Sequence, residues 1–184
     1  FHAERETLRV IHTRHEQGAA YMALGYAQST GREAVCAVVP GPGVLNAGAG
    51  LLTAYGNGAK VLCIGGQIPS KAIDKGVGLL HEMYDQKGTM AATTKWQTRI
   101  DTAEDAPAAI GEAFRQMNTG RQRPVFVEMA PDIMAAKTEL DIPATNQDYE
   151  MLQPDPDLVE QAAALLGNAE NPAIFVGGGI FGAE

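Results

Sequence analysis

Apolar and polar positions follow two different periods along the chain, and together they predict strands that alternate with helices. Continuous apolar runs between turn residues are typical of parallel strands covered on both faces. The predicted strands cover residues 9–13, 34–39, 60–66, 94–100, 124–130 and 171–179. Apolar residues three or four positions apart predict helices over 15–31, 44–55, 103–119 and 154–169. This alternation indicates an α/β fold, an open parallel sheet with helices on both faces.

The pattern also divides the chain. Residues 1–131 form a first α/β domain, residues 132–156 are rich in proline without a hydrophobic period and predict a linker, and residues 157–184 predict the start of a second, Rossmann-like α/β domain. The sequence begins at Phe1 rather than Met, so we expect the N-terminal part of the first domain to be missing. Residues 67–99 show little periodicity, which is typical of a functional excursion.

Composition and charge exclude several classes of protein. The 184 residues carry a net charge of −8, and 45% of them are hydrophobic. Residues 101–184 hold 4 basic and 15 acidic side chains, which argues against a nucleic-acid partner. No apolar run approaches the roughly 20 residues of a membrane span. Cys36 and Cys63 lie within apolar runs and are expected to be buried thiols of a cytoplasmic protein.

Two His-Glu pairs, at residues 15–16 and 81–82, suggest zinc at first sight. A zinc-binding helix of that kind needs a second His four residues after the first. Ala19 and Asp85 occupy those positions, so no metal site is predicted within this chain.

Two glycine-rich turns follow predicted strands, at residues 41–46 and 177–182. The second matches the G-x-G-x-x-G pattern of nucleotide-binding turns, whereas the first has Asn46 in place of the third Gly. A tight strand-to-helix turn is the simpler interpretation of both, because a lone match of this kind is weak.

Glu16 lies in the first turn of a predicted helix, directly after a predicted strand. In parallel α/β sheets, ligands bind at the carboxyl ends of the strands. The position is therefore a candidate site, although a Glu there also stabilises the helix dipole without any further function.

The strings RHEQGAAYMALGYAQSTG, AVVPGPGVLNAGAGLLTAY and KVLCIGGQIPS resemble the pyrimidine-binding domain of thiamine diphosphate-dependent enzymes, in the branch of the acetolactate synthases. GRQRPVFVEMAPDIM is similar to the last strand of that domain, and NPAIFVGGG is similar to the start of the central domain. The resemblance implies that residues 1–131 are the pyrimidine-binding domain and that the protein is a lyase or transferase acting on 2-oxo acids.

The resemblance also implies roles for particular residues. Glu16 matches the glutamate that hydrogen-bonds N1′ of the aminopyrimidine and thereby favours the tautomer that removes the C2 proton of the thiazolium. Burial between subunits is expected to raise its pKa, so that it shares a proton. Gly41, Pro42, Gly43 and Asn46 match the loop beside the pyrimidine.

His81 and Glu82 fall where the synthases carry a Gln-Glu pair on the substrate side. His81 replaces the Gln, and the spacing to Asp85 is one residue longer than expected, which argues against acetolactate formation. Two interpretations of His81 stay open. It either exchanges a proton with the substrate, or it is a loop histidine without such a role.

Thiamine diphosphate and Mg²⁺ are the implied cofactors, with Mg²⁺ bound by a domain outside this chain, because the Gly-Asp-Gly…Asn motif is not in these residues. The turn at 177–179 does not decide whether FAD binds in the central domain. The whole protein is expected to be a homodimer or homotetramer, and the fragment alone to be inactive. Two alternatives stay open. One is a benzoylformate decarboxylase-like enzyme, because the Lys95-Trp96 pair resembles the sequence of that branch as much as that of the synthases. The other is a non-catalytic nucleotide-binding α/β module.

Overall fold

A computed structural model describes residues 4, 6–140, 142, 149 and 153–180 of the chain. Its strands are β1 (Ala34–Val38), β2 (Val61–Gly66), β3 (Trp96–Ile100) and β4 (Val125–Met129). Its helices are α1 (Glu16–Thr30), α2 (Pro42–Asn57), α3 (Gln86–Met90), α4 (Ala106–Asn118), α5 (Pro131–Met134) and α6 (Pro156–Asn168). Short 3₁₀ turns cover Ser70–Ala72, Ala103–Asp105 and Gly178–Ile180.

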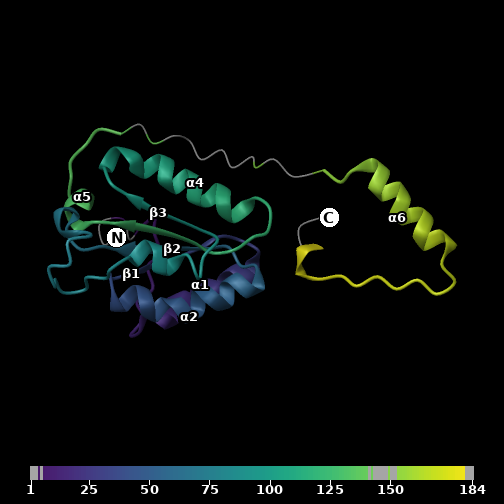
Figure 1. The fold of residues 1–184 in the computed structure, drawn as a ribbon, viewed down its shortest axis with the longest axis horizontal. Helices are drawn as coiled ribbons and strands as arrows, with labels where there is room; N and C mark the ends of the chain where they lie inside the picture. Colours follow the sequence, from purple (N-terminus) through teal and green to yellow (C-terminus); the bar gives the residue numbers. More distant parts are fainter. Residues whose placement is uncertain (1–3, 5, 141, 143–148, 150–152, 181–184) are drawn as a thin grey trace.

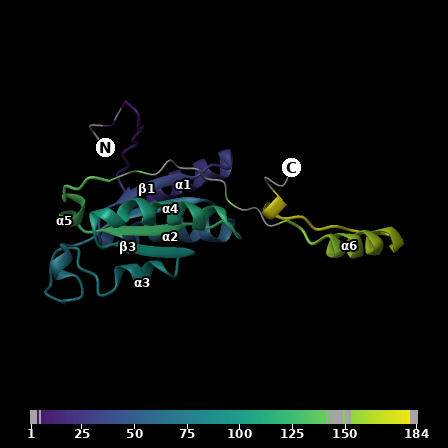
Figure 2. The same ribbon diagram turned by 90° about the horizontal axis from the view of Figure 1, so that it is seen from above.

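The four strands form one parallel sheet in the order β1-β2-β4-β3. In Figure 1, α1 and α2 lie on one side of this sheet and α4 lies on the other, and Figure 2 gives the view from the side of α4. The predicted open parallel sheet with helices on both faces is therefore confirmed. Because all strands run the same way, their carboxyl ends meet at one edge of the sheet.

Each face of the sheet has its own apolar core. The face toward α1 and α2 buries small residues of both helices together with Val61, Cys63 and Phe126. The face toward α4 buries Val125 and Val127 against Met117. Alternate residues of β4 thus serve opposite cores, as the two-residue period of a strand requires.

Two predicted strands do not form. Residues 9–13 have no regular structure, and residues 172–177 have none either before the 3₁₀ turn at 178–180. A strand is stable only when a neighbouring strand accepts and donates its backbone hydrogen bonds, and neither segment has one among the described residues. Residues 153–180 are exposed throughout, including α6. No helix of the described chain is long and apolar enough to cross a membrane.

The helices α1 and α2 approach each other closely because one of them has a glycine at the contact. A Cβ atom added to Gly50 would lie 2.7 Å from Cβ of Ala20 and 3.1 Å from its carbonyl carbon. Both residues are buried. The small residues that the sequence carries on these helices therefore set the distance between the two backbones.

We predict that Gly50→Val destabilises the protein by about 1–3 kcal/mol, because the added side chain meets backbone atoms that cannot turn away. The measurement is the free energy of unfolding in urea. Gly111→Ala is the control, since Gly111 is exposed within α4 and has no atom within 4 Å of the added Cβ. It should be neutral or stabilise by up to about 1 kcal/mol. Equal effects of the two variants would contradict the prediction.

Candidate functional site

Glu16 is the first residue of α1, as predicted, and it lies beside the first turn of α2. The helix begins after His15, whose Nδ1 accepts a hydrogen bond from the backbone of Gln17 at 3.1 Å. One carboxylate oxygen of Glu16 accepts a hydrogen bond from Nδ2 of Asn46 at 3.0 Å. The sequence places these two residues 30 positions apart, and the fold brings them together.

Helical spacing explains this contact. Glu16 precedes Ala20 by four residues, and Asn46 precedes Gly50 by four, so each pair shares one face of its helix. The close contact between Ala20 and Gly50 therefore places Glu16 against Asn46 one turn earlier.

Gly43 completes this group. A Cβ atom added to Gly43 would lie 3.5 Å from Oε1 of Glu16 and 2.5 Å from Cγ2 of Val39. A side chain would therefore clash with Val39, and it would lie in van der Waals contact with the Glu16 carboxylate. In the group formed by Glu16, Gly43 and Asn46, Glu16 is half-buried and its carboxylate lies between the first turns of two helices.

The pKa of Glu16 is lowered from its ordinary value, chiefly by the hydrogen bond from Asn46 and next by a hydrogen bond from its own backbone amide. Both interactions favour the charged form. The expected rise through burial between subunits is not present in the single chain, in which Glu16 is an anion at neutral pH.

Gly41, the residue before α2, has a conformation that only glycine adopts readily, with φ 60° and ψ −113°. A Cβ atom at this position would meet the carbonyl oxygen of His81 at 2.6 Å. His81 itself has a positive φ of 70°. The structure thus brings the backbone of His81 against the turn of Gly41 and Pro42. No hydrogen bond to the imidazole is found among the described residues.

Glu82 folds back onto its own loop. Its carboxylate accepts hydrogen bonds from the backbone amides of Val77 at 3.2 Å, Gly78 at 2.5 Å and Leu79 at 2.8 Å. These amides, with Leu79 the strongest contributor, lower the pKa of Glu82. In this structure Glu82 closes the 77–82 loop.

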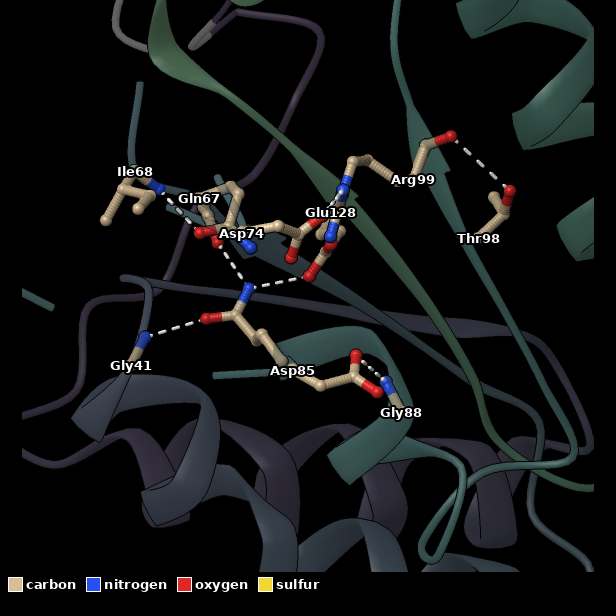
Figure 3. Close-up of polar contacts among 11 residues, drawn as sticks. Gly41, Gln67, Ile68, Asp74, Asp85, Gly88, Thr98, Arg99 and Glu128 are labelled. Atoms are coloured by element: carbon tan, nitrogen blue, oxygen red, sulfur yellow. Dashed lines mark hydrogen bonds and ion pairs between the residues drawn. The ribbon is translucent and has the colours of Figure 1, made fainter. Parts of the chain in front are cut away.

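The sequence did not reveal a buried polar cluster at the same edge of the sheet. Glu128 of β4 is fully buried and accepts hydrogen bonds from Nε of Arg99 at 2.7 Å and from Nε2 of Gln86 at 2.8 Å. Figure 3 shows Glu128 and Arg99 on neighbouring strands, with Asp74 close by. A Glu inside the apolar run PVFVEMA was the available signal, because a buried carboxylate needs a partner.

Arg99 joins this cluster to the irregular segment. Its other guanidinium nitrogen lies 3.8 Å from the Asp74 carboxylate. Burial disfavours the charged form of Arg99, but the hydrogen bond and charge of Glu128 outweigh it, so the pKa of Arg99 is raised. The segment after β2 is therefore tied to β3 by an ion pair.

The remaining chemical candidates have structural roles. Nζ of Lys95 donates to the carbonyl oxygens of Gln116 at 2.7 Å and Thr119 at 2.5 Å, at the end of α4. Cys36 and Cys63 are paired in register on β1 and β2, and both are buried, as predicted. The hydrogen bond that the Cys63 thiol shares with Cys36, together with burial, raises the pKa of Cys63 well above its ordinary value. In the described parts of the chain, no three His, Cys, Asp or Glu residues are grouped as metal ligands.

Comparison with known proteins gives the class to which this arrangement belongs. Residues 1–89 match the family model described as thiamine pyrophosphate enzyme, N-terminal TPP binding domain. This segment contains Glu16, the turn at Gly41–Gly43, Asn46, and the loop with His81 and Glu82. Residues 1–89 of the chain thus match this family of domains, as the sequence resemblance predicts.

Curated relatives match most of the chain. It is 37% identical over 167 residues to the acetolactate synthase isozyme 2 large subunit of Escherichia coli, covering 91% of this chain and 30% of that protein. It is 34% identical over 177 residues to the probable 2-ketoarginine decarboxylase AruI of Pseudomonas aeruginosa, covering 96% and 32%. The mitochondrial acetolactate synthase catalytic subunit of Saccharomyces cerevisiae is 34% identical, with 91% and 25% covered. The chain spans about a third or less of the length of these relatives.

We predict that Asn46→Ala raises the pKa of Glu16 toward its ordinary value, because the amide that stabilises the carboxylate is removed. A ¹³C NMR titration with carboxyl-labelled glutamate measures it. Thr53→Val is the control, since Thr53 lies on the same helix and bonds Tyr21 rather than Glu16. A Glu16 pKa that is the same in the parent and in Asn46→Ala would show that Asn46 does not set it.

Proposed function

We propose that the full-length protein is a thiamine diphosphate-dependent enzyme that acts on 2-oxo acids, and that this chain supplies the carboxyl group that binds the aminopyrimidine ring. The observation that carries the proposal is the contact of Glu16 with Asn46 beside the glycine at position 43. The acetolactate synthases among the relatives support the same chemistry.

The residues present fit an aminopyrimidine. Gly41 and Gly43 keep the turn beside Glu16 free of side chains of its own, with the backbone of His81 packed against Gly41 and the side chain of Val39 packed against Gly43. Glu16 offers a carboxylate that is open to a ligand, and it would hold or share a proton at a ring nitrogen. When bound, the cofactor supplies the electron sink for decarboxylation. The diphosphate and Mg²⁺ would be held by residues outside this chain. The proposal also includes the division of the chain into a pyrimidine-binding domain that ends at residue 131 and a central domain that starts at residue 157.

A second subunit would complete the site. The outer faces of α1 and α2 expose large apolar side chains at between 41% and 54% of their area. These residues are Tyr21, Met22, Tyr26, Leu45 and Leu52. An exposed apolar face of this kind marks an interaction surface, and here it adjoins Glu16. We therefore propose a homodimer or homotetramer in which this face is covered. The cytoplasmic location remains a prediction.

The alternative is a simple decarboxylase. The relative named as a probable 2-ketoarginine decarboxylase supports it, and so does His81 in place of the Gln of the synthases. The two reactions differ in what accepts the intermediate after carbon dioxide leaves. Product analysis with single 2-oxo acids separates them: release of an aldehyde supports the decarboxylase, and a longer hydroxy-oxo acid supports the synthase.

We expect Glu16→Gln in the full-length protein to slow proton exchange at C2 of bound thiamine diphosphate on the order of 10²–10⁴-fold, the range for one acid–base group. NMR of the exchange in D₂O measures it at saturating cofactor and Mg²⁺. Glu33→Gln is the control, because Glu33 pairs with Lys60 at the opposite edge of the sheet. An unchanged exchange rate in Glu16→Gln would refute the role of Glu16. Absence of cofactor binding to the folded parent, measured by calorimetry, would refute the function.

Leu52→Glu is expected to shift the full-length protein toward a smaller species, because it places a charge in the proposed subunit contact. Sedimentation velocity measures the distribution. Ala108→Glu on the exposed side of α4 serves as control and should leave the distribution unchanged. A parent that sediments as a monomer would contradict the assembly.

A further inference from the structure

One buried side chain, Gln86, connects three elements at the carboxyl edge of the sheet. It is the first residue of α3, and only 1% of it is exposed. Its carboxamide oxygen accepts a hydrogen bond from the backbone amide of Gly41 at 2.8 Å. Its nitrogen donates to the carbonyl of Gly66 at 2.9 Å and to Glu128 at 2.8 Å. Gln86 therefore links the end of β2, strand β4 and the turn that begins α2.

The chemistry of these partners fixes the orientation of Gln86. A carbonyl and a carboxylate only accept hydrogen bonds, so the amide nitrogen must face Gly66 and Glu128. The oxygen then faces Gly41, whose backbone amide only donates. Glu128 is in turn held by Arg99 on the neighbouring strand, at 2.7 Å. Figure 3 shows Gly41, Glu128 and Arg99 around this point.

Gly41 is the residue that most needs such a support. Its φ of 60° is strained for other residues, and glycine loses more conformational freedom on folding than any other residue. The bond to Gln86 holds its backbone amide, while the backbone of His81 fills the space beside its Cα. The position of the turn relative to Glu16 thus depends on Gln86.

We propose that Gln86 is a positioning residue: it holds the Gly41–Gly43 turn, on which the cofactor ring would lie, at a fixed place beside Glu16. Glu128 and Arg99 act through it by holding its amide group. Gln86 does not reach the reacting atoms and acts only through Gly41. This inference rests on the proposed function of the site.

The test compares Gln86→Met with Thr94→Val in the full-length protein. Methionine keeps the length of the side chain but removes the three hydrogen bonds that Gln86 makes, to Gly41, Gly66 and Glu128. Thr94 is a matched control, because it is 3% exposed, follows α3 and loses one buried hydrogen bond, to the carbonyl of Met90 at 2.7 Å. Thermal midpoints of both variants establish how far each is destabilised.

The first measurement needs no cofactor. Hydrogen exchange of the Gly41 amide, resolved by mass spectrometry with fragmentation, should become about tenfold faster in Gln86→Met, the equivalent of one lost hydrogen bond. It should stay at the parent rate in Thr94→Val. Equal acceleration in both variants, or none in Gln86→Met, would overturn the inference.

The second measurement separates positioning from catalysis. The dissociation constant for thiamine diphosphate with Mg²⁺ should rise about tenfold in Gln86→Met, while C2 exchange at saturating cofactor stays at the parent rate because Glu16 is intact. An unchanged dissociation constant overturns this inference alone. A parent that binds no cofactor overturns the proposed function as well, and the calorimetry of the parent distinguishes the two failures.

If Gln86→Met does not fold, Glu128→Gln makes the same test. Gln86 and Arg99 donate to different carboxylate oxygens of Glu128, so a glutamine there would place an NH₂ group, which only donates, at one of the two positions. With its oxygen paired to the Arg99 cation, that NH₂ group would face Gln86. Exchange of the Gly41 amide should again become faster than in Thr94→Val, and an unchanged rate would overturn the inference.

Discussion

The contact of Gly50 with Ala20 is the constraint on which the candidate site depends. It lets the backbones of α1 and α2 approach until their side chains meet one turn earlier, where Glu16 and Asn46 form their hydrogen bond. Larger residues at the contact would separate the helices, and the carboxylate would lose its partner. The small residues of these helices therefore serve the site as well as the packing, because the same periodicity places both pairs on the same faces.

A second constraint is the cost of burying Glu128. A carboxylate with no exposed surface is tolerated only when it is paired and hydrogen-bonded, and breaking such a pair costs about 3–5 kcal/mol. Arg99 and Gln86 meet that requirement. Because Arg99 also lies near Asp74, and Gln86 holds Gly41, the need to pair one charge fixes two loops at the same edge of the sheet. Polar contacts thus hold the irregular segment between β2 and β3 to the sheet at Asp74 and at Gln86.

The sequence predicted the elements that have a strong period, but not the contacts between them. The helix at Glu16–Thr30 and the strands β1 to β4 were correct within a few residues, because their apolar patterns reflect burial in a parallel sheet. Residues 9–13 and 171–179 have similar local patterns, but no neighbouring strand pairs with them among the described residues. A strand depends on its neighbour, which local sequence does not specify.

The candidate site shows the same division. Glu16 and the turn of Gly41–Gly43 were recognisable, because a family motif marks them in one short stretch each. The cluster of Gln86, Arg99 and Glu128 was not, since its members are 13 to 42 residues apart and belong to a helix and two strands. A single Glu in an apolar strand predicts that a partner exists, but the identity of that partner follows only from the register of β3 with β4 and the position of α3.

The electrostatics of Glu16 connect the single chain to the proposed assembly. Within the chain, Asn46 and the backbone amide of Glu16 itself stabilise the charged form, and the residue remains half-buried. A group that shares a proton with a ring nitrogen needs a pKa closer to neutrality. Desolvation raises a carboxyl pKa by up to 3–5 units, which exceeds the effect of one neutral hydrogen bond. Covering the apolar faces of α1 and α2 with a second subunit would supply that desolvation beside Glu16. In the proposed enzyme, the chain provides the position of the carboxyl group and the assembly provides its reactivity.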